Sequence, residues 1–314
     1  MDKLPFEDIK REVISLSKDF KLDNYIPDIP ELLNNGIILI DKPAGPTSHQ
    51  VSDQVKKILN INKAGHSGTL DPNVTGVLPI ALGNGTKVIQ ALLNAGKEYV
   101  CVMHVHDDIA EEKLREVINS FVGKIKQVPP VKSAVKRQER VRTVYYINIL
   151  EIKDRDVLFK VGCQAGTYIR KLCSDIGEKL GSGAHMAELR RTKAGPFNES
   201  ELITLHDLTD AFHEYNKDNF KLIEKILLPI EAGIKHLTKI WVKNSTVESL
   251  CHGAQLNIPG IALLESNIKP KDMVAILDSR NKLILLGNAI LSSKDMIDKK
   301  EGMAVKTLRV FMIN

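Results

Sequence analysis

The sequence predicts an α+β protein in which helices flank a large mixed or antiparallel sheet, followed by a small C-terminal β-barrel. Three observations support this prediction. Up to about residue 235, strand-like apolar runs and amphipathic stretches follow one another without regular βαβ alternation. Beyond Pro229, short apolar segments are separated by Gly, Pro, Asn and Asp, which is typical of closed all-β modules. A length of 314 residues suits two domains better than one core.

Apolar periodicity predicts the elements of the first part. The run Gly36–Asp41 is typical of a buried strand, and Thr47 or Ser48 then caps a helix. A later helix carries the apolar stripe Ile169, Leu172, Cys173, Ile176 and Leu180. The other predicted elements are strands at 97–103, 144–152 and 157–163 and helices at 110–122 and 167–180.

Composition divides the chain into three parts. Residues 1–35 are charged and interrupted by proline, which is typical of an arm lying on a folded body. Residues 36–235 hold the large sheet and its helices, and residues 236–314 hold the small β-barrel. The strands predicted in this last part are Lys239–Lys243, Met273–Leu277, Lys282–Leu291 and Met303–Ile313.

The overall composition limits the classes of function. A net charge of +5 permits an anionic partner without requiring one. The four cysteines have no CxxC spacing, which argues against a zinc knuckle or a disulfide framework and fits a reducing, cytoplasmic compartment. The N-terminus is too charged for a signal peptide, and no apolar run reaches membrane-spanning length. We therefore expect a soluble protein without a membrane partner.

No metal site is predicted. His104 and His106 alternate on a predicted strand, which places them on the same face. Two histidines without a third ligand are more typical of a polar surface than of a metal centre.

The turn around Asp71 is the strongest candidate for chemistry. It reads Gly65-His66-Ser67-Gly68-Thr69-Leu70-Asp71-Pro72, with two glycines before the acid and a proline after it. Glycine permits backbone conformations closed to other residues, and the proline prevents a helix from starting at Asp71. A plain turn aspartate is the alternative for such an Asp-Pro pair. The surrounding motifs favour a functional carboxylate.

Several cations could act with this acid or with a polyanion. Arg170 lies in the first turn of a predicted helix, where the dipole disfavours a lone cation, so we expect a carboxylate partner. A basic cluster suited to phosphate contacts follows Pro129-Pro130 in a predicted loop, although such runs are often only a solvated face. The cations that could contact a nucleic-acid backbone are Lys132, Lys136, Arg137, Arg140, Arg142, Arg190 and Arg191.

Together these segments resemble the TruB-type pseudouridine synthases, and most closely the archaeal and eukaryotic branch guided by H/ACA RNA, the dyskerin family. The arm before residue 36 and the short segment at 104–128 favour this branch, and the absence of Lys-rich tails favours its archaeal form. The part after residue 235 resembles a PUA RNA-binding module. The motifs are DKPAGPTSH at 41–49, GHSGTLDPNVTGVLPI at 65–80, KEY at 97–99, VPPVKSAVKR at 128–137, GTYIRKL at 166–172 and AHMAELRRTKAGPF at 184–197.

The resemblance implies specific roles for residues that match the family motifs. Asp71 matches the catalytic aspartate, Tyr99 the tyrosine that stacks on the target base and is a proposed general base, and Arg170 the arginine that pairs with the aspartate. The pocket around the flipped uracil is implied to include His66, Tyr168, Leu189, Lys42 and Pro43.

The resemblance also implies partners. These are an H/ACA guide RNA, a substrate rRNA or tRNA, and three small proteins: a zinc-ribbon-like peptide, a β-barrel protein and a kink-turn-binding ribosomal-type protein. The arm is implied to pack near the PUA module.

The implied reaction breaks the C1′–N1 bond of uridine, turns the uracil and forms a C1′–C5 bond. It needs no cofactor, because there is neither a redox step nor a leaving group. Breaking a glycosidic bond builds positive charge on the sugar, which an ionised Asp71 in a dry pocket would stabilise or trap. Two alternatives remain: a stand-alone tRNA pseudouridine synthase, and an RNA-binding scaffold without catalysis.

Overall fold

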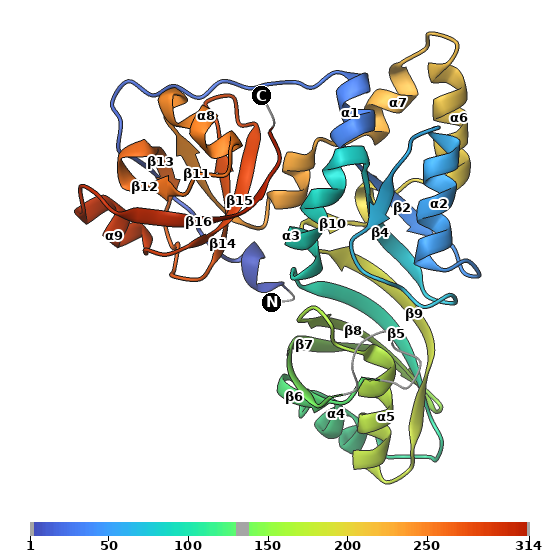
Figure 1. Cartoon of the computed structure of the whole chain (residues 1–314). Helices are drawn as coiled ribbons and strands as arrows, with labels where there is room; N and C mark the ends of the chain where they lie inside the picture. Colours follow the sequence, from blue (N-terminus) through green and yellow to red (C-terminus); the bar gives the residue numbers. More distant parts are fainter. Residues whose placement is uncertain (1–2, 130–137, 313–314) are drawn as a thin grey trace.

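A computed structural model describes residues 3–129 and 138–312 of the chain (Figure 1). Its larger sheet has nine strands, and β4 and β9 run parallel while the other neighbouring strands are antiparallel. The prediction of a mixed or antiparallel sheet is confirmed. In spatial order the strands are β2 (Ile37–Lys42), β4 (Thr75–Leu82), β9 (Ala184–Ala194), β5 (Lys97–Val105), β8 (Asp156–Cys163), β7 (Arg140–Lys153) and β6 (Gly123–Gln127), with β3 (Ala64–His66) beside β4 and β10 (Phe197–Asn198) beside β9.

Helices pack against this sheet through the apolar stripes that the sequence predicts. In α5 the five predicted stripe residues are all buried, and the helix ends at Gly181 with φ +79°. The helix after β2 begins with a capping box in which Thr47 and Gln50 exchange side-chain and backbone hydrogen bonds. The helices of this part are α1 (Ile29–Asn35), α2 (Ser48–Ile58), α3 (Ile89–Leu93), α4 (Glu111–Asn119), α5 (Ile169–Leu180), α6 (Leu205–Tyr215) and α7 (Lys221–Ile226).

A second, seven-stranded sheet holds the C-terminal part of the chain (Figure 1). The four strands predicted there are confirmed. Five elements of this part were not predicted from the sequence, and each has eight residues or fewer: β1 (Val13–Ser15), β12 (Leu256–Asn257), β13 (Ile261–Glu265), α8 (Asn244–Cys251) and α9 (Ser293–Asp298). In spatial order the strands are β1 (Val13–Ser15), β13 (Ile261–Glu265), β11 (Thr238–Val242), β14 (Met273–Leu277), β15 (Leu283–Ala289), β16 (Met303–Val310) and β12 (Leu256–Asn257), accompanied by α8 (Asn244–Cys251) and α9 (Ser293–Asp298).

The two sheets share one hydrophobic cluster. It contains Leu39 and Val77 from the larger sheet together with Trp241, Ala275 and Leu286 from the smaller sheet, all buried. Because these side chains exclude water together, the interface between the two parts resembles a domain core.

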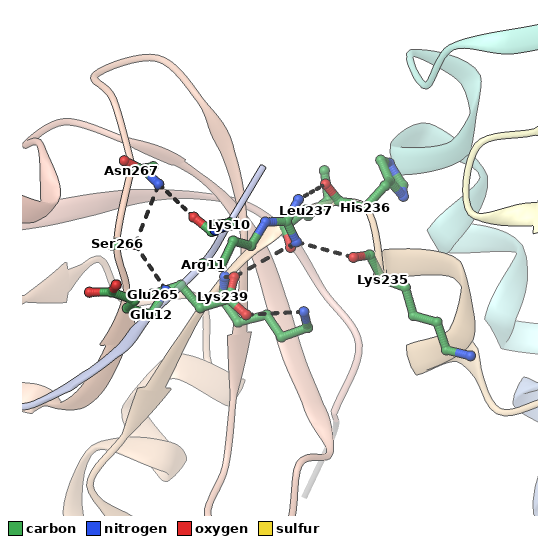
Figure 2. A network of polar contacts seen from close by, with 10 residues as sticks. All are labelled: Lys10, Arg11, Glu12, Lys235, His236, Leu237, Lys239, Glu265, Ser266 and Asn267. Carbon is green, nitrogen blue, oxygen red and sulfur yellow. Dashed lines mark hydrogen bonds and ion pairs between the residues drawn. The ribbon is translucent and has the colours of Figure 1, made fainter. Parts of the chain in front are cut away.

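The N-terminal arm is bonded to both parts. Its strand β1 pairs antiparallel with β13 of the smaller sheet, and its Leu4 is fully buried next to Gly96, where the chain enters β5. Figure 2 shows the polar network beside β1, in which Arg11 donates to the carbonyl oxygens of Lys235, His236 and Leu237 at 3.1, 2.6 and 2.7 Å. The arm therefore fixes the segment that joins the two sheets.

We predict that Arg11→Ala lowers the free energy of unfolding by about 2 kcal/mol, because three backbone carbonyl oxygens, two of them in partly buried contacts, lose a charged donor. Urea unfolding would measure this loss. The control is Arg115→Ala, which removes an exposed pair with Glu111 within α4 and should cost at most about 0.5 kcal/mol. Equal effects of the two substitutions would contradict a special role for the arm.

We also predict a stability that depends on His236 in mild acid. The side chain is 9% exposed, its Nε2 donates to the Ala91 carbonyl oxygen at 3.2 Å, and burial lowers its pKa to about 4 from the usual 6.5. The unfolded chain binds a proton between pH 6.5 and 4 that the folded chain rejects, so stability falls as the pH drops through this window.

The full difference corresponds to about 3 kcal/mol. Urea unfolding at pH 7, 5.5 and 4.5 should show a smaller acid loss in His236→Gln than in the unsubstituted protein. Parallel pH profiles would contradict this assignment.

Candidate active site

Asp71 lies on the loop that connects β3 to β4. Of the two glycines before it, Gly68 has a φ of +125°, a region that side chains rarely adopt. Gly65 is needed for packing instead, because a Cβ atom there would lie 2.9 Å from the Cδ1 atom of Ile89. After the acid, Val74 N–H donates to the Asp71 carbonyl oxygen at 3.0 Å. The irregular turn predicted from the sequence is therefore present.

Two side chains from the preceding segment hold this loop in place. The Lys42 side chain is fully buried, and its Nζ donates to the carbonyl oxygens of Pro43, Pro72 and Val74, each at 2.8 Å. Ser48 Oγ accepts from Leu70 N–H at 2.8 Å. The strand β2 and the start of α2 thus fix the loop on both sides of Asp71, and the place of Lys42 and Pro43 in the uracil pocket stays a prediction.

Arg170 and Asp71 form an ion pair between the guanidinium Nη2 and the carboxylate Oδ2. Arg170 occupies the first turn of α5, so the expected carboxylate partner is present. The side chains of Arg170 and Asp71 are 47% and 50% exposed. The prediction of a dry pocket is wrong for the free protein, because the loop holds Asp71 at the surface.

Tyr99 and Leu189 provide an apolar wall on the face of the sheet that α5 covers. Both are half-buried and pack against the hydrophobic cluster that contains Cys101, Ile169 and Cys173. Burial raises the pKa of the Tyr99 phenol, and the positive charge of Arg191, together with a hydrogen bond to it, opposes this shift. The raised pKa keeps the phenol neutral at pH 7, which favours a stacking role over that of a phenolate base.

Arg191 does not lie at the surface, contrary to the prediction that it contacts RNA. It is 1% exposed; its Nε donates to the Val77 carbonyl oxygen at 2.8 Å and its Nη2 to that of Gly68 at 3.3 Å. It reaches inward because β9 pairs parallel to β4 here, with Gly76 opposite Arg191. A Cβ atom on Gly76 would lie 2.2 Å from the Arg191 carbonyl oxygen, so only glycine fits.

Arg190 faces the other side of β9 and is engaged with acids. It makes two hydrogen bonds to the Asp41 carboxylate, at 2.9 and 3.0 Å, and one to Glu199 at 2.6 Å. A guanidinium that two carboxylates already satisfy is poorly suited to bind phosphate. This arrangement therefore argues against the RNA contact expected of Arg190, and nothing near Arg190 in the sequence points to Asp41 or Glu199 as its partners.

The remaining pocket residues lie around the same loop. His66 is half-buried on β3, its Nδ1 has no hydrogen-bond partner among the described residues, and burial together with Arg191 lowers its pKa, so the ring is neutral at pH 7. Tyr168 is the residue before α5, two positions ahead of Arg170. The structure brings these residues to the same end of the sheet as Asp71.

Most of the predicted basic cluster lies outside the described residues. This applies to Lys132, Lys136 and Arg137. Arg140 and Arg142 are described, and they lie on β7, because this strand begins earlier than the predicted 144. The Arg142 guanidinium lies close to Gly166, two residues before Tyr168. A Cβ atom on Gly166 would lie 3.2 Å from Nε and from Nη2 of Arg142.

Two buried polar residues that support the site were not predicted from the sequence. Lys97 begins β5, two residues before Tyr99, and its Nζ donates to the carbonyl oxygens of Leu92, Leu93 and Ala95 at 2.7 to 3.0 Å. Gln127, at the end of β6, bonds to the backbone of Tyr168. Lys97 stands in the KEY motif and could have been found there, whereas nothing in the sequence near Gln127 points to its partner.

The histidine pair on β5 gains a third member in space. His185 of β9 lies opposite His104, and its Nδ1 is 3.0 Å from His106 Nε2. Within residues 3–129 and 138–312, however, no set of three or more potential ligands is arranged to hold a metal ion. Over the same residues, no helix is long and apolar enough to cross a bilayer.

Comparison with known proteins decides the family. The TruB family pseudouridylate synthase N-terminal domain matches residues 56–169, the tRNA pseudouridylate synthase B C-terminal domain matches residues 170–235, and the PUA domain matches residues 238–311. The chain belongs to the TruB family of pseudouridylate synthases. It is thus an RNA uridine isomerase with a PUA domain, and the α+β fold predicted for this family is confirmed.

Archaeal members of the TruB family are similar over nearly the whole chain. "Probable tRNA pseudouridine synthase B" of Pyrococcus abyssi is 53% identical and covers 97% of this chain and 94% of its own. The protein of the same name from Methanopyrus kandleri is 53% identical over 90% of this chain and 84% of its own.

Two solved TruB-family structures are also similar. "Crystal Structure of a Cbf5-Nop10-Gar1 Complex" has a chain with a TM-score of 0.94 and 50% identity, covering 99% of this chain and 97% of that one. "Structure of H/ACA RNP bound to a substrate RNA containing 2'-deoxyuridine" has one with a TM-score of 0.91 and 47% identity, with the same coverage.

The two arginine environments in this TruB-family protein lead to a prediction. We expect Arg190→Ala to lower the free energy of unfolding by about 1 kcal/mol, because Asp41 and Glu199 lose their shared cation, and to leave RNA affinity within about twofold. We expect Arg140→Ala to weaken RNA binding and to reduce the slope of log affinity against log salt concentration by about 1. Salt titrations of RNA binding with both variants would test this, and the reverse pattern would place the RNA over Arg190.

Proposed function

We propose that this chain converts uridine to pseudouridine in RNA at Asp71, as the catalytic subunit of a ribonucleoprotein that positions its substrate with an H/ACA guide RNA. The observation that carries the proposal is the ion pair between Asp71 and Arg170, on a loop fixed by Lys42 and beside the wall of Tyr99 and Leu189. This arrangement offers an ionised carboxylate next to a site for one unstacked base.

The chemistry requires an anionic oxygen at the sugar. As the C1′–N1 bond breaks, positive charge develops on C1′, and the Asp71 carboxylate stabilises or traps that centre. The detached uracil then turns and bonds to C1′ through C5, while the proton leaving C5 is balanced by a proton gained at N1. Arg170 lies against the carboxylate, where its guanidinium favours the negative charge that the reaction needs.

A stacked uridine cannot reach Asp71, so the target must be flipped out of its helix at a cost of a few kcal/mol. Tyr99 offers the aromatic face that recovers part of this cost, and Leu189 confines the free uracil. Asp71 and Arg170 are half-exposed in the free protein. The bound RNA itself therefore completes the exclusion of water that strengthens electrostatic interactions at the site.

The guide-dependent mode is supported by likeness over the whole chain. The structural alignment with the similar chain in the H/ACA ribonucleoprotein covers 97% of that chain. It covers 99% of this chain and so includes the N-terminal arm. We propose that the protein works with a guide RNA and with small proteins such as Nop10 and Gar1 in the similar complex. A kink-turn-binding protein belongs to the same proposal, as does a cytoplasmic location.

Stand-alone action on tRNA is the second candidate. It is favoured by the name of the archaeal relatives, which are called tRNA pseudouridine synthase B. Both modes use the same chemistry and differ in how the uridine is positioned. Reconstitution on a target RNA with a matching guide and the partner proteins, and separately on bare tRNA, would distinguish them.

We predict that Asp71→Asn lowers the single-turnover rate of pseudouridine formation by at least about 1,000-fold, because a neutral amide cannot stabilise or trap the cationic sugar. RNA affinity should remain within about threefold. The matched control is Asp53→Asn, which alters an exposed aspartate paired with Lys56 on α2 and should leave the rate unchanged.

The readout is pseudouridine content of a short RNA after excess enzyme is added. Full activity of Asp71→Asn would refute the assignment of Asp71. Absence of product with the unsubstituted protein under guide-dependent and bare-tRNA conditions would favour the RNA-binding scaffold.

A further inference from the structure

We propose that Gln127 is a positioning residue for catalysis, which sets the place of Arg170 by holding the backbone at the start of α5. The inference rests on the proposed roles of Asp71 and Arg170. In the described contacts Gln127 bonds to the backbone of Tyr168 and not to Asp71 or Arg170, so its effect on Arg170 must pass through that backbone.

The contact between Gln127 and Tyr168 uses both ends of the amide. Gln127 Oε1 accepts from Tyr168 N–H at 3.0 Å, and Gln127 Nε2 donates to the Tyr168 carbonyl oxygen at 3.1 Å. Gln127 is 3% exposed. A buried amide that bonds to both backbone groups of one residue restricts the position and the orientation of that peptide segment.

The start of α5 needs such support, because the helix has no side-chain cap of its own. Tyr168 is its N-cap residue and offers no side-chain acceptor to the first turn, and no acidic residue lies in that turn. The Tyr168 carbonyl oxygen also accepts the helical hydrogen bond from Leu172 at 2.9 Å. Gln127 therefore binds the residue from which the helix starts, two positions before Arg170.

A second glutamine ties the preceding residues to the neighbouring strand. Gln164 N–H donates to the Thr143 carbonyl oxygen at 2.8 Å, and Gln164 Oε1 accepts from Thr143 N–H at 3.1 Å. Thr167 Oγ1 donates to the Gln164 carbonyl oxygen at 2.7 Å. Residues 164–168 are thus fixed at both ends, by β7 and by β6.

The geometry makes Arg170 sensitive to this contact. Arg170 lies in the first turn of α5, so a shift of the start of this helix moves the backbone that carries the guanidinium relative to Asp71. Misplacement of a catalytic group by about 1 Å can cost on the order of 100-fold in rate. Loss of the Gln127 contact should therefore reduce the chemical step without removing any group that binds RNA.

The first test is Gln127→Leu, which keeps the volume approximately and removes both hydrogen bonds. We expect the single-turnover rate at saturating RNA to fall by about 10- to 100-fold, with RNA affinity within about twofold. In an Arg170→Ala background the same substitution should cost less than about threefold, because its effect passes through Arg170. The matched control is Gln255→Leu, which breaks a hydrogen bond from Thr307 N–H to a glutamine side chain in the C-terminal sheet.

The second variant is Gln127→Glu, which separates positioning from a general loss of stability. The ionised carboxylate accepts from Tyr168 N–H but repels the Tyr168 carbonyl oxygen, whereas the protonated acid donates to that oxygen and restores the pair. Burial favours the protonated form. The rate of Gln127→Glu relative to the unsubstituted protein should therefore rise as the pH falls from 8 to 6, while Gln255→Leu keeps a constant ratio.

Three outcomes would overturn the inference. They are an unchanged single-turnover rate in Gln127→Leu, a loss of equal size with and without Arg170, and a pH-independent ratio for Gln127→Glu. Failure of the proposed function looks different: the unsubstituted protein then makes no pseudouridine. If Gln127→Leu does not fold, two measurements on Gln127→Glu test the inference in its place. They are its pH profile and a double-mutant cycle with Arg170→Ala.

Discussion

The geometry of the active site depends on the buried guanidinium of Arg191. Its guanidinium bonds to the Val77 carbonyl oxygen on β4, to the Gly68 carbonyl oxygen on the Asp71 loop and to the Tyr99 side chain. Burial of a guanidinium is costly, and it remains charged because its intrinsic pKa is so high. The cost is acceptable here because one side chain joins three segments that must keep a fixed geometry. Gly76 makes the arrangement possible by letting the two backbones meet.

The rest of the molecule restricts the same junction from a distance. Lys193, two residues beyond Arg191, pairs with Glu7 of the N-terminal arm at 2.9 Å, and Glu7 also accepts from Leu4 N–H. The arm then continues into β1 of the C-terminal sheet, whose core is shared with the catalytic part. A structural change in the PUA domain can therefore reach β9 through the N-terminal arm and through the shared core. These contacts couple the two parts energetically only if the junction around β9 can adopt two conformations.

Periodicity predicted much of the fold, because strands and helices with a buried face must repeat every two or about 3.6 residues. The α5 stripe and the capped start of α2 were found in this way. The Asp71–Arg170 pair could be expected because a first-turn arginine needs an anion. The burial of Arg191 and the more exposed position of Arg190 could not be predicted in this way. Neighbouring residues on a strand point to opposite faces, and only the pairing with β4 decides which face is buried. The contact of Gln127 with Tyr168, 41 residues away, leaves no local signal either.

Buried hydrogen bonds, rather than the exposed ion pair, fix the positions of Asp71 and Arg170. Asp71 and Arg170 meet in contact with water, where an ion pair alone gives little positional energy because solvent screens it. Hydrogen bonds in the interior are not weakened in this way, so the buried Lys42 side chain with its backbone carbonyls and Gln127 with the Tyr168 backbone are better suited to fix the two partners. The ion pair then contributes charge rather than position. This arrangement leaves the carboxylate open to an incoming sugar while its position is already set before RNA binds.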